Sequence, residues 1–176
     1  MHEDLLTALT QGPALILVTG PAGQGKTTAI EAVLADTRCP HNIAFLGDIR
    51  GDVEEAARAV QLARSQIVVA VLRIMHAAGA FARLLDMGVP ASDLLGVVRT
   101  VFTTRILRLQ SEVLLLHEQL LVTSAIRGLI LAGADSEAIH RQAVADGMLS
   151  LRTAGNELVR AGRVGAEAIA DLTPED

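Results

Sequence analysis

The sequence has few cysteines, few aromatic residues and a deficit of positive charge. Cys39 is its one cysteine, so an internal disulfide and a multi-thiolate zinc site are both excluded. Trp and Tyr are absent and aromatics make up 2% of the residues, which leaves few platforms for stacking bases. The formal net charge is −5, whereas nucleic-acid-binding domains are usually basic. We therefore expect no nucleic-acid partner, and a buried or half-buried packing role for Cys39.

Long uninterrupted apolar runs are also missing. The most apolar region, residues 66–82, contains Arg73 and His76, and a bilayer-spanning helix needs about 20 predominantly apolar residues. The chain begins Met-His-Glu-Asp, which places acid where a secretory signal peptide carries base. We expect no transmembrane segment and a cytoplasmic location.

The aliphatic residues that are present follow the pattern of an α/β domain. Hydrophobic residues make up 51% and charged residues 20% of the 176 positions, enough to bury one core. Short apolar runs alternate with stretches of helical spacing, which predicts a parallel sheet with right-handed crossovers. The predicted strands are 14–19, 42–46 and 66–72, and the helices between them are 26–34 and 53–64. The residues of the second helix expected to face the core are Val53, Ala56, Ala57, Val60 and Ala63.

The second half of the chain is predicted to be mainly helical. The predicted helices are 77–87, 91–98, 123–132, 136–145, 150–160 and 165–172, with Asp135 and Ser136 as cap residues of the fourth. Residues 112–116 indicate a strand, and 103–109 fit either a strand or a helix end. We accordingly expect an α/β core over 1–100 and a mainly helical part over 101–176 that packs on it as one structural unit.

A phosphate-binding motif follows the first predicted strand. Residues 20–27, Gly-Pro-Ala-Gly-Gln-Gly-Lys-Thr, match the Walker A pattern GxxxxGK[ST] without a mismatch and open a predicted helix. The glycines allow main-chain N–H groups to converge on an anion, and the helix N-terminus adds to the attraction. A glycine turn that only joined strand to helix would need neither Lys26 nor Thr27. We expect ATP to be bound by Gly20, Pro21, Ala22, Gly23, Gln24, Gly25, Lys26, Thr27 and Thr28.

Such a loop works with Mg²⁺ and a nearby carboxylate. We expect Lys26 to reach the β- and γ-phosphates and the Thr27 hydroxyl to coordinate Mg²⁺. Asp48 follows a short apolar run and is the candidate second metal ligand and, with Lys26, the candidate catalytic residue. A turn or helix-cap role fits Asp48 equally well. Asp52 is a weaker candidate and a better N-cap for the next helix, while Arg50 is either a charge partner or solvated.

Several segments occur in an order that is found in one known family. They are the phosphate loop GPAGQGKTT, then FLGDIRGDVEEAARAV, then AVLRIMHAAGAFARLLDMGVP, and a C-terminal stretch from residue 120 with Gly147, Met148 and Leu151 in a Gly-Met-x-x-Leu turn. Together they resemble the ATPase domain of the type II secretion and type IV pilus assembly motor family. The resemblance implies a RecA-like P-loop NTPase fold with a reduced parallel sheet and a helical C-terminal part. It also implies a homo-oligomer, or association with a related motor ATPase or with secretion or pilus machinery.

The sequence departs from that family at positions linked to hydrolysis. The family carries Gly-Glu-x-Arg at the end of a catalytic strand, and this chain has Gly-Asp-Ile-Arg at 47–50. The histidine of the family's histidine box corresponds to Arg73, whereas His76 aligns elsewhere and is expected to be structural. The acidic segment with the family's catalytic glutamate, its N-terminal domain and its four-cysteine zinc insertion have no counterpart.

These departures favour nucleotide binding over rapid turnover. The first hypothesis is an ATP-binding relative of the motors that hydrolyses ATP slowly, with arginines supplied by a neighbouring subunit or a separate chain. The alternative is a catalytically degenerate regulatory or interaction module that binds ATP or ADP without turnover. A small-molecule kinase is disfavoured because the C-terminal half offers no arginine-rich lid. Both leading hypotheses require ATP and Mg²⁺ as ligands.

Overall fold

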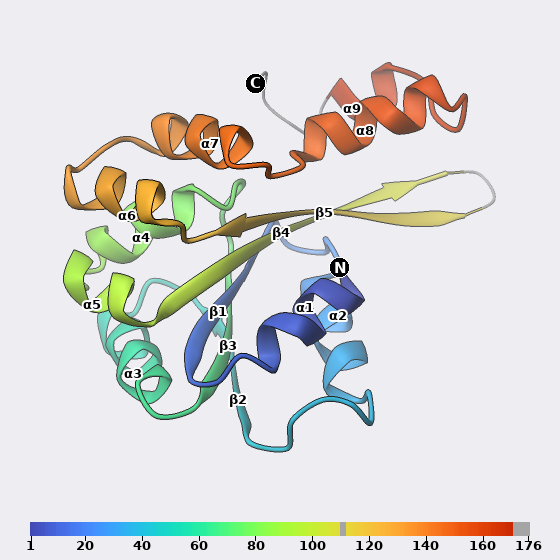
Figure 1. Ribbon diagram of the computed structural model, residues 1–176. Coiled ribbons are helices and arrows are strands. Elements are labelled where there is room, and N and C mark those ends of the chain that lie inside the picture. The colour runs from blue at the N-terminus through green and yellow to red at the C-terminus, as the bar shows by residue number, and fades with distance from the viewer. Residues whose placement is uncertain (110–111, 171–176) are drawn as a thin grey trace.

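Runs of valine, isoleucine and leucine form the strands of a five-stranded sheet in the computed structural model, which describes residues 1–109 and 112–170 (Figure 1). In chain order the strands are β1 (Ala14–Thr19), β2 (Ile43–Ile49), β3 (Ile67–Leu72), β4 (Val98–Arg108) and β5 (Val113–Leu121). Across the sheet their order is β2-β3-β1-β4-β5. Strands β1 to β4 are parallel, and β5 pairs antiparallel with β4 as a long hairpin.

Helices connect the strands and form the last part of the described chain. They are α1 (His2–Leu9), α2 (Lys26–Leu34), α3 (Val53–Ala63), α4 (Gly79–Asp86), α5 (Ala91–Val97), α6 (Ser124–Leu131), α7 (Ser136–Ala145), α8 (Leu151–Arg160) and α9 (Glu167–Ala170). None of the helices in the described ranges has the length and hydrophobicity that crossing a bilayer requires.

The two faces of the sheet are buried under different helices. On β1, Leu15 and Leu17 pack into a core shared with α3 to α7, whereas Ile16 and Val18 pack into a second core with α1 and α2. This division follows from the alternation of side chains along a strand. Cys39 is buried in the second core, as expected. The phosphate loop between β1 and α2 therefore lies at the edge of a sheet covered on both faces, as in α/β proteins with a parallel sheet.

The regular elements of the first half are those that the sequence predicts. β1 and α2 have the predicted bounds, and α3 is one residue shorter at its C-terminal end. The Asp52 carboxylate accepts a hydrogen bond from the Glu54 N–H and caps α3, and Asp135 caps α7 in the same way. The α/β, RecA-like fold class is confirmed.

Three features differ from the expectation. Helix α1 was not predicted, because its eight residues carry only a short apolar stripe (Leu5, Leu6, Ala8 and Leu9). The region left open, 103–109, lies almost entirely in β4, and the strand predicted at 112–116 is confirmed within β5; the proposed boundary after residue 100 falls inside β4. The inward face assigned to α3 was partly wrong: Val53 and Ala57 are exposed, while Ala59 is buried in their place.

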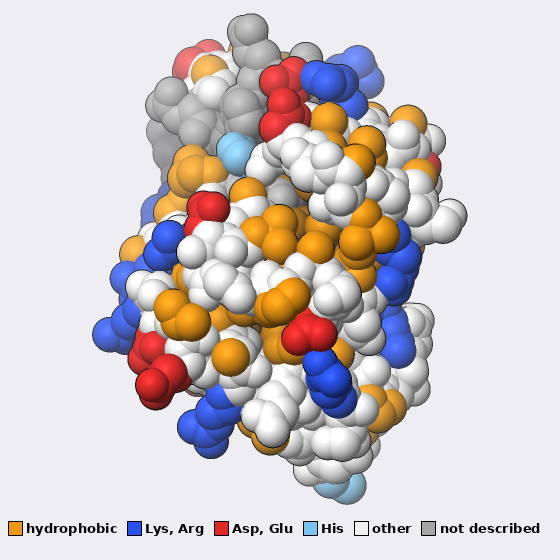
Figure 2. Space-filling model, turned by 90° about the vertical axis from the view of Figure 1, so that its left-hand side faces the viewer, with side chains coloured by type: hydrophobic (Ala, Val, Ile, Leu, Met, Phe, Trp, Pro, Cys, Tyr) orange, Lys and Arg blue, Asp and Glu red, His pale blue; other side chains and the backbone are white. Residues whose placement is uncertain are grey.

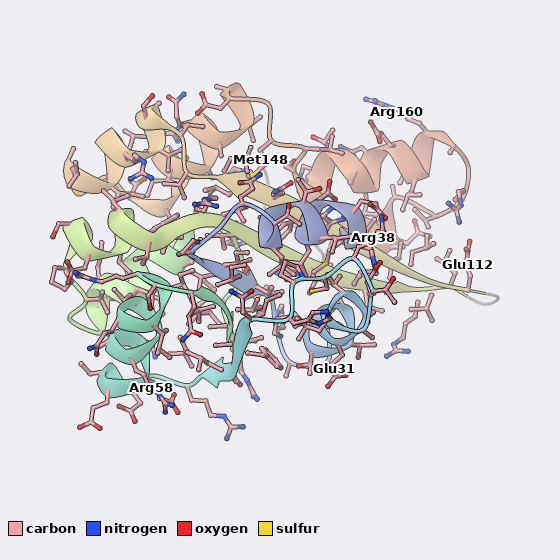
Figure 3. The ribbon with its side chains drawn as sticks, turned by 60° about the horizontal axis from the view of Figure 1, so that its bottom comes forward. Glu31, Arg38, Arg58, Glu112, Met148 and Arg160 are labelled. Carbon is pink, nitrogen blue, oxygen red and sulfur yellow. The ribbon has the colours of Figure 1, made fainter. Side chains whose placement is uncertain are left out.

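The C-terminal helices lie over the hairpin (Figure 1). Helix α8 packs against β5, and Arg163, in the turn after α8, pairs with Glu112 next to β5 at 2.6 Å. On the opposite face, Arg38, which Figure 3 labels, joins α1 to the end of α2 by binding both Glu3 and Asp36. One face of the hairpin therefore packs against the C-terminal helices, and its other face contacts the phosphate loop.

Candidate functional site

The loop from Gly20 to Gly25 has the backbone of an anion-binding turn. Gly20, Gly23 and Gly25 have φ angles of 137°, 75° and 73°, a region that residues with a side chain rarely adopt. Gly25 is the N-cap residue of α2 and has no side chain with which to cap it. The first N–H groups of α2 therefore point into the loop, where they and the helix dipole favour an anion.

Lys26 lies on the inner wall of this loop. Its side chain is 6% exposed, and the Nζ atom donates to the carbonyl oxygens of Gly20 at 2.7 Å and Pro21 at 2.5 Å. Burial lowers the pKa of the ammonium below its usual range, an effect that the carboxylate of Asp48 opposes and the charge of Arg73 reinforces. An ammonium has three donors, so two loop carbonyls leave one N–H for a phosphate oxygen.

Strand β4 supports the other side of the loop. The Thr104 hydroxyl donates to the carbonyl oxygen of Gln24 at 2.7 Å, and the Ile106 N–H donates to the side-chain oxygen of Gln24 at 2.5 Å. A Cβ added to Gly20 would lie 2.7 Å from the Thr104 carbonyl oxygen, and one added to Gly25 would lie 3.1 Å from the Ile106 side chain. Glycine is required at position 20 because the close atom is main chain, whereas a side chain at position 25 would have to displace Ile106.

A cavity of about 510 Å³ opens beside the loop. The sequence-predicted residues that line it are Ala22, Gly23, Gln24, Gly25, Lys26, Thr27, Thr28 and Asp48. Gly20 and Pro21 do not line the cavity, but their carbonyl oxygens accept hydrogen bonds from Lys26. Arg50, Val71, Arg73, Ile106 and Arg108 complete the lining. The structure thus brings residues from β1, β2, β3 and β4 to one opening at the carboxyl ends of the strands, the usual position of a ligand site in this type of sheet.

A bulge in β2 directs Asp48 into this cavity. Phe45 pairs with Val69 of β3, but Asp48 pairs with Val71, so three steps along β2 match two along β3. Gly47, with φ 72°, lies within the irregular segment, as a glycine often does in a bulge. Without the extra residue, Asp48 would point to the opposite face of the sheet. With it, Asp48 shares a face with Val71, which also lines the cavity.

The carboxylate of Asp48 is held by arginine side chains. Its Oδ2 atom accepts a hydrogen bond from Arg73 Nε and lies 3.6 Å from Arg50 Nε. Its Oδ1 atom is buried and has no hydrogen-bond partner among the described residues. A buried acceptor without a partner is costly, and a cation or a water bound to one would satisfy it. This unpaired oxygen fits the expected role of Asp48 as a ligand or outer-shell partner of Mg²⁺ in the cavity that Thr27 also lines.

The cavity carries an excess of positive charge. The described residues lining it include four cations, Lys26, Arg50, Arg73 and Arg108, against the single carboxylate of Asp48. No group of three or more His, Cys, Asp or Glu side chains that could hold a metal by themselves occurs in residues 1–109 and 112–170. The arrangement therefore suits a polyphosphate whose own oxygens complete the coordination of a metal ion.

The site contains residues that the sequence did not single out. Thr104, Ile106 and Arg108 come from β4, which lies beside β1 in the sheet although about 80 residues separate the two in the chain. Arg73 was noted only as the replacement of a histidine. No local pattern marks these positions, because their role depends on which strand lies next to β1.

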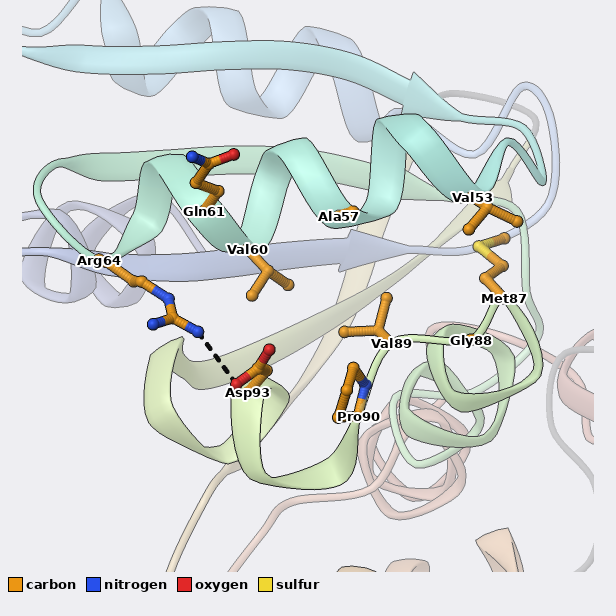
Figure 4. A pocket seen from close by; sticks show the side chains of 10 residues that line it. All are labelled: Val53, Ala57, Val60, Gln61, Arg64, Met87, Gly88, Val89, Pro90 and Asp93. Carbon is orange, nitrogen blue, oxygen red and sulfur yellow. Dashed lines mark hydrogen bonds and ion pairs between the residues drawn. The ribbon is translucent and has the colours of Figure 1, made fainter.

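A second, more apolar hollow of about 430 Å³ lies between α3 and α5 (Figure 4). Val60 and Val89 line it, and the ion pair between Arg64 and Asp93, at 3.0 Å, lies at one end. Figure 2 shows the molecule from the side of α4 to α6, where hydrophobic side chains gather between charged ones. With its charges already paired, this hollow fits a phosphate less well than the cavity beside Lys26.

Two curated proteins are similar to this chain in sequence. No protein-family model matches the chain. It is 26% identical to the type II secretion system protein HxcR of Pseudomonas aeruginosa, over 94% of this chain and 50% of that protein. It is 28% identical to the type IV pilus assembly ATPase PilB of the same organism, over 60% of this chain and 26% of that protein. The chain thus spans half or less of the length of these curated relatives.

Solved structures share the fold at lower sequence identity. The pilus retraction motor PilT with bound ADP superposes with a TM-score of 0.83 at 19% identity, over 98% of this chain and 65% of that one. The ATPase DotB of Legionella pneumophila gives a TM-score of 0.77 at 15% identity, over 97% of this chain and 64% of that one. The chain therefore shares its fold with PilT and DotB.

Proposed function

Because this chain is related to the ATPase domains of type II secretion and type IV pilus assembly motors, we propose that it binds Mg-ATP and hydrolyses it slowly. The observation that carries the proposal is the loop of residues 20–28, which opens into a cavity of about 510 Å³ with Lys26 on its wall. The proposal includes a role in protein export or pilus assembly, as a homo-oligomer or in association with a related motor.

The residues of the loop have distinct tasks in this proposal. The main-chain N–H groups of residues 22–26 and the N-terminus of α2 bind the β-phosphate. Lys26 bridges the β- and γ-phosphates, and Thr28 lies toward the α- or β-phosphate. The buried position of Lys26 strengthens this contact, because a charge interaction increases as water is excluded.

Magnesium would be held by the Thr27 hydroxyl and by Asp48, directly or through water. When bound, it supplies positive charge that stabilises the transferring phosphoryl group. The buried, unpaired Oδ1 of Asp48 is the acceptor available to orient a water molecule or the metal's hydration shell.

Slow hydrolysis follows from the shortage of acids. Asp48 is the one carboxylate among the described residues that line the cavity, and it already interacts with Arg73 and Arg50. Because Oδ2 of Asp48 is occupied by arginine, only Oδ1 remains to orient a water molecule. An arginine from a neighbouring chain would raise the rate, by about 10³-fold or more in other phosphoryl-transfer enzymes.

The first test uses ligand-induced stabilisation. Saturation with Mg-ATP at about 100 times its Kd adds about 2.7 kcal/mol, and each kcal/mol moves the Tm of a domain of this size by about 2 to 4 °C. We expect a Tm increase of about 5 to 10 °C in the wild type and none in Lys26→Ala. Arg58→Ala, on the exposed side of α3 away from the cavity (Figure 3), is the matched control and keeps the increase. A wild-type melting curve that Mg-ATP leaves unchanged contradicts the proposal.

A second test exploits the fact that Lys26 is the only lysine in the chain. An amine-directed acylating reagent followed by mass spectrometry therefore reports on Lys26 and on the N-terminal amine alone. Mg-ATP is expected to protect Lys26 while the N-terminal amine, on the α1 side, reacts as before. Phosphate release, measured in parallel, is expected to require Mg²⁺, to disappear in Lys26→Ala, and to rise with protein concentration if oligomerisation supplies an arginine. Binding with release at background level would leave only the binding part of the proposal.

A further inference from the structure

Arg73 lines the cavity beside the phosphate loop, at the end of β3. The last pair in the register between β1 and β3 is Thr19 with Leu72, so Arg73 leaves the sheet beside Gly20, the first residue of the phosphate loop. Its side chain lines the same cavity as Lys26 and Asp48. The charges of Asp48 and Arg73 both act on the Lys26 ammonium, so the three groups that line this cavity interact electrostatically.

The contact that Arg73 makes is an exchangeable one. Its Nε atom donates to Asp48 Oδ2, while the two terminal nitrogens make no hydrogen bond within residues 1–109 and 112–170. The side chain is 55% exposed and Asp48 is 16% exposed, so the guanidinium lies at the open side of the cavity. Exposed ion pairs contribute little free energy, whereas a guanidinium binds phosphate through two parallel hydrogen bonds. A phosphate close to Asp48 would therefore compete successfully for Arg73.

We propose that Arg73 is a γ-phosphate-binding residue that gives the site a preference for nucleoside triphosphates over diphosphates, with Asp48 as its partner when no triphosphate is bound. The inference rests on the proposed nucleotide binding and goes beyond it, because the phosphate loop alone contacts mainly the β-phosphate. When Arg73 moves to the phosphate, it releases the Oδ2 atom of Asp48. The carboxylate of Asp48 is then free to interact with Mg²⁺ or its water ligands. Binding of the γ-phosphate by Arg73 is thereby coupled to metal binding by Asp48.

The other two arginines of the cavity are less suited to this role. Arg50 is 76% exposed and its closest contact with Asp48 is 3.6 Å. Arg108 is exposed near the end of β4, beyond the part of the strand that supports the loop. Both raise the affinity for any anionic nucleotide, but neither leaves the sheet beside the start of the loop. Only Arg73 combines that position with a direct hydrogen bond to Asp48.

The experiment compares two nucleotides in four proteins. Calorimetric titration measures Kd for Mg-ADP and for the non-hydrolysable analogue Mg-AMP-PNP in wild type, Arg73→Gln, Arg58→Gln and Lys26→Ala. Hydrogen bonds to charged groups are worth about 10- to 100-fold in affinity, and the exchange with Asp48 offsets part of this. We expect the wild type and Arg58→Gln to prefer AMP-PNP about tenfold, and Arg73→Gln to bind both nucleotides with the ADP affinity of the wild type.

Each outcome separates this inference from the proposed function. A wild type that binds neither nucleotide overturns the proposed function itself. Binding of both with the tenfold preference intact in Arg73→Gln overturns the assignment of Arg73 and leaves the proposed function standing. An equal weakening of both nucleotides in Arg73→Gln also overturns it, because it shows general attraction of anions.

A second variant tests the competition without removing Arg73. Asp48→Asn removes the negative charge that holds Arg73 and weakens their hydrogen bond, so in the presence of EDTA it is expected to bind AMP-PNP severalfold more tightly than the wild type does. The affinity for ADP should change less than that for AMP-PNP. Unchanged or weaker AMP-PNP binding in Asp48→Asn would contradict the competition between Asp48 and the terminal phosphate.

Discussion

Two acidic side chains near the carboxyl edge of the sheet lie in contrasting surroundings. Asp48, at the end of β2, is bound by exposed arginine side chains and keeps one oxygen without a partner. Glu118, on β5, is 3% exposed and uses both oxygens: Oε1 accepts from the N–H of Ala77 at 3.3 Å and Oε2 from the N–H of Leu151 at 3.2 Å. Exposed arginine side chains bind Asp48, whereas main-chain N–H groups bind Glu118.

Glu118 connects β5 to the segment before α4 and to the start of α8. Its two acceptors fix the segment before α4 and the first turn of α8 to the same strand. Arg105, 2% exposed on β4, donates to the carbonyl oxygens of Met75 at 2.6 Å and Thr104 at 3.0 Å. Buried polar groups that are fully paired stabilise a structure, and an unpaired one beside an opening is available to a ligand. Glu118 therefore has a structural role, because it fixes two segments to the sheet. Asp48, with one unpaired oxygen, is the acid at this edge that can interact with a ligand.

The largest expected effect is on stability, at Glu118. Glu118→Ala leaves two buried N–H groups without acceptors and removes a negative charge near the buried Arg105. We expect a loss of about 2 to 5 kcal/mol, which corresponds to a Tm decrease of about 4 to 20 °C. Glu112→Ala is the matched control, since Glu112 is 43% exposed and paired with Arg163, and it should cost less than about 1 kcal/mol. Equal Tm values for the two variants would show that Glu118 contributes no more to stability than the exposed Glu112.

The next effect concerns pH and two partly buried histidines. Burial lowers the pKa of His76, near Glu118, and of His117, which contacts Asp4, below the usual 6.5. The unfolded chain then binds protons at a higher pH than the folded one, so stability is complete above about pH 6.5 and decreases as the pH falls below it. We expect a lower Tm at pH 5.5 than at pH 7.5.

Substitution of one histidine tests the origin of that slope. His76→Gln is expected to reduce the difference in Tm between the two pH values, while His41→Gln, at an exposed position, retains the wild-type difference. Differential scanning fluorimetry in buffers of matched ionic strength is sufficient. A Tm that rises on acidification would contradict the assigned direction of both pKa shifts.

The smallest stability effect is expected at Asp48. Asp48→Asn removes the negative charge that pairs with two arginines, both more than half exposed, and these can be solvated instead. The free energy of unfolding should change by less than about 1 kcal/mol, whereas the Mg²⁺ dependence of nucleotide binding should weaken. Urea unfolding and titration of Mg²⁺ against bound AMP-PNP measure the two quantities. A large loss of stability would place Asp48 with Glu118 as a structural acid.

Much of the nucleotide-binding half was predictable because its signals are local. Five consecutive apolar residues followed by Thr19 indicated β1, the glycine pattern indicated the loop, and Asp52 indicated the start of α3. The hairpin was harder to predict: residues 112–116 indicated a strand, but the segment that forms β4 fitted either a strand or a helix end, and its full length becomes recognisable only through pairing with β1 and β5. Helix α1 is stabilised by burial against α2 and the sheet, and tertiary burial is not visible in a stretch of eight residues.

The phosphate loop follows directly from the residues, because two glycines, one lysine and one threonine at fixed spacing define it. The alternation of strand and helix follows from hydrophobic periodicity. Which side chains face the loop depends on the folded chain. The bulge at Gly47 turns Asp48 into the cavity, the parallel pairing of β1 with β3 brings Arg73 beside Gly20, and the pairing of β1 with β4 sets Thr104 against the loop. These positions could not be predicted because register and strand order are fixed by packing between distant segments, which no local pattern of residues encodes.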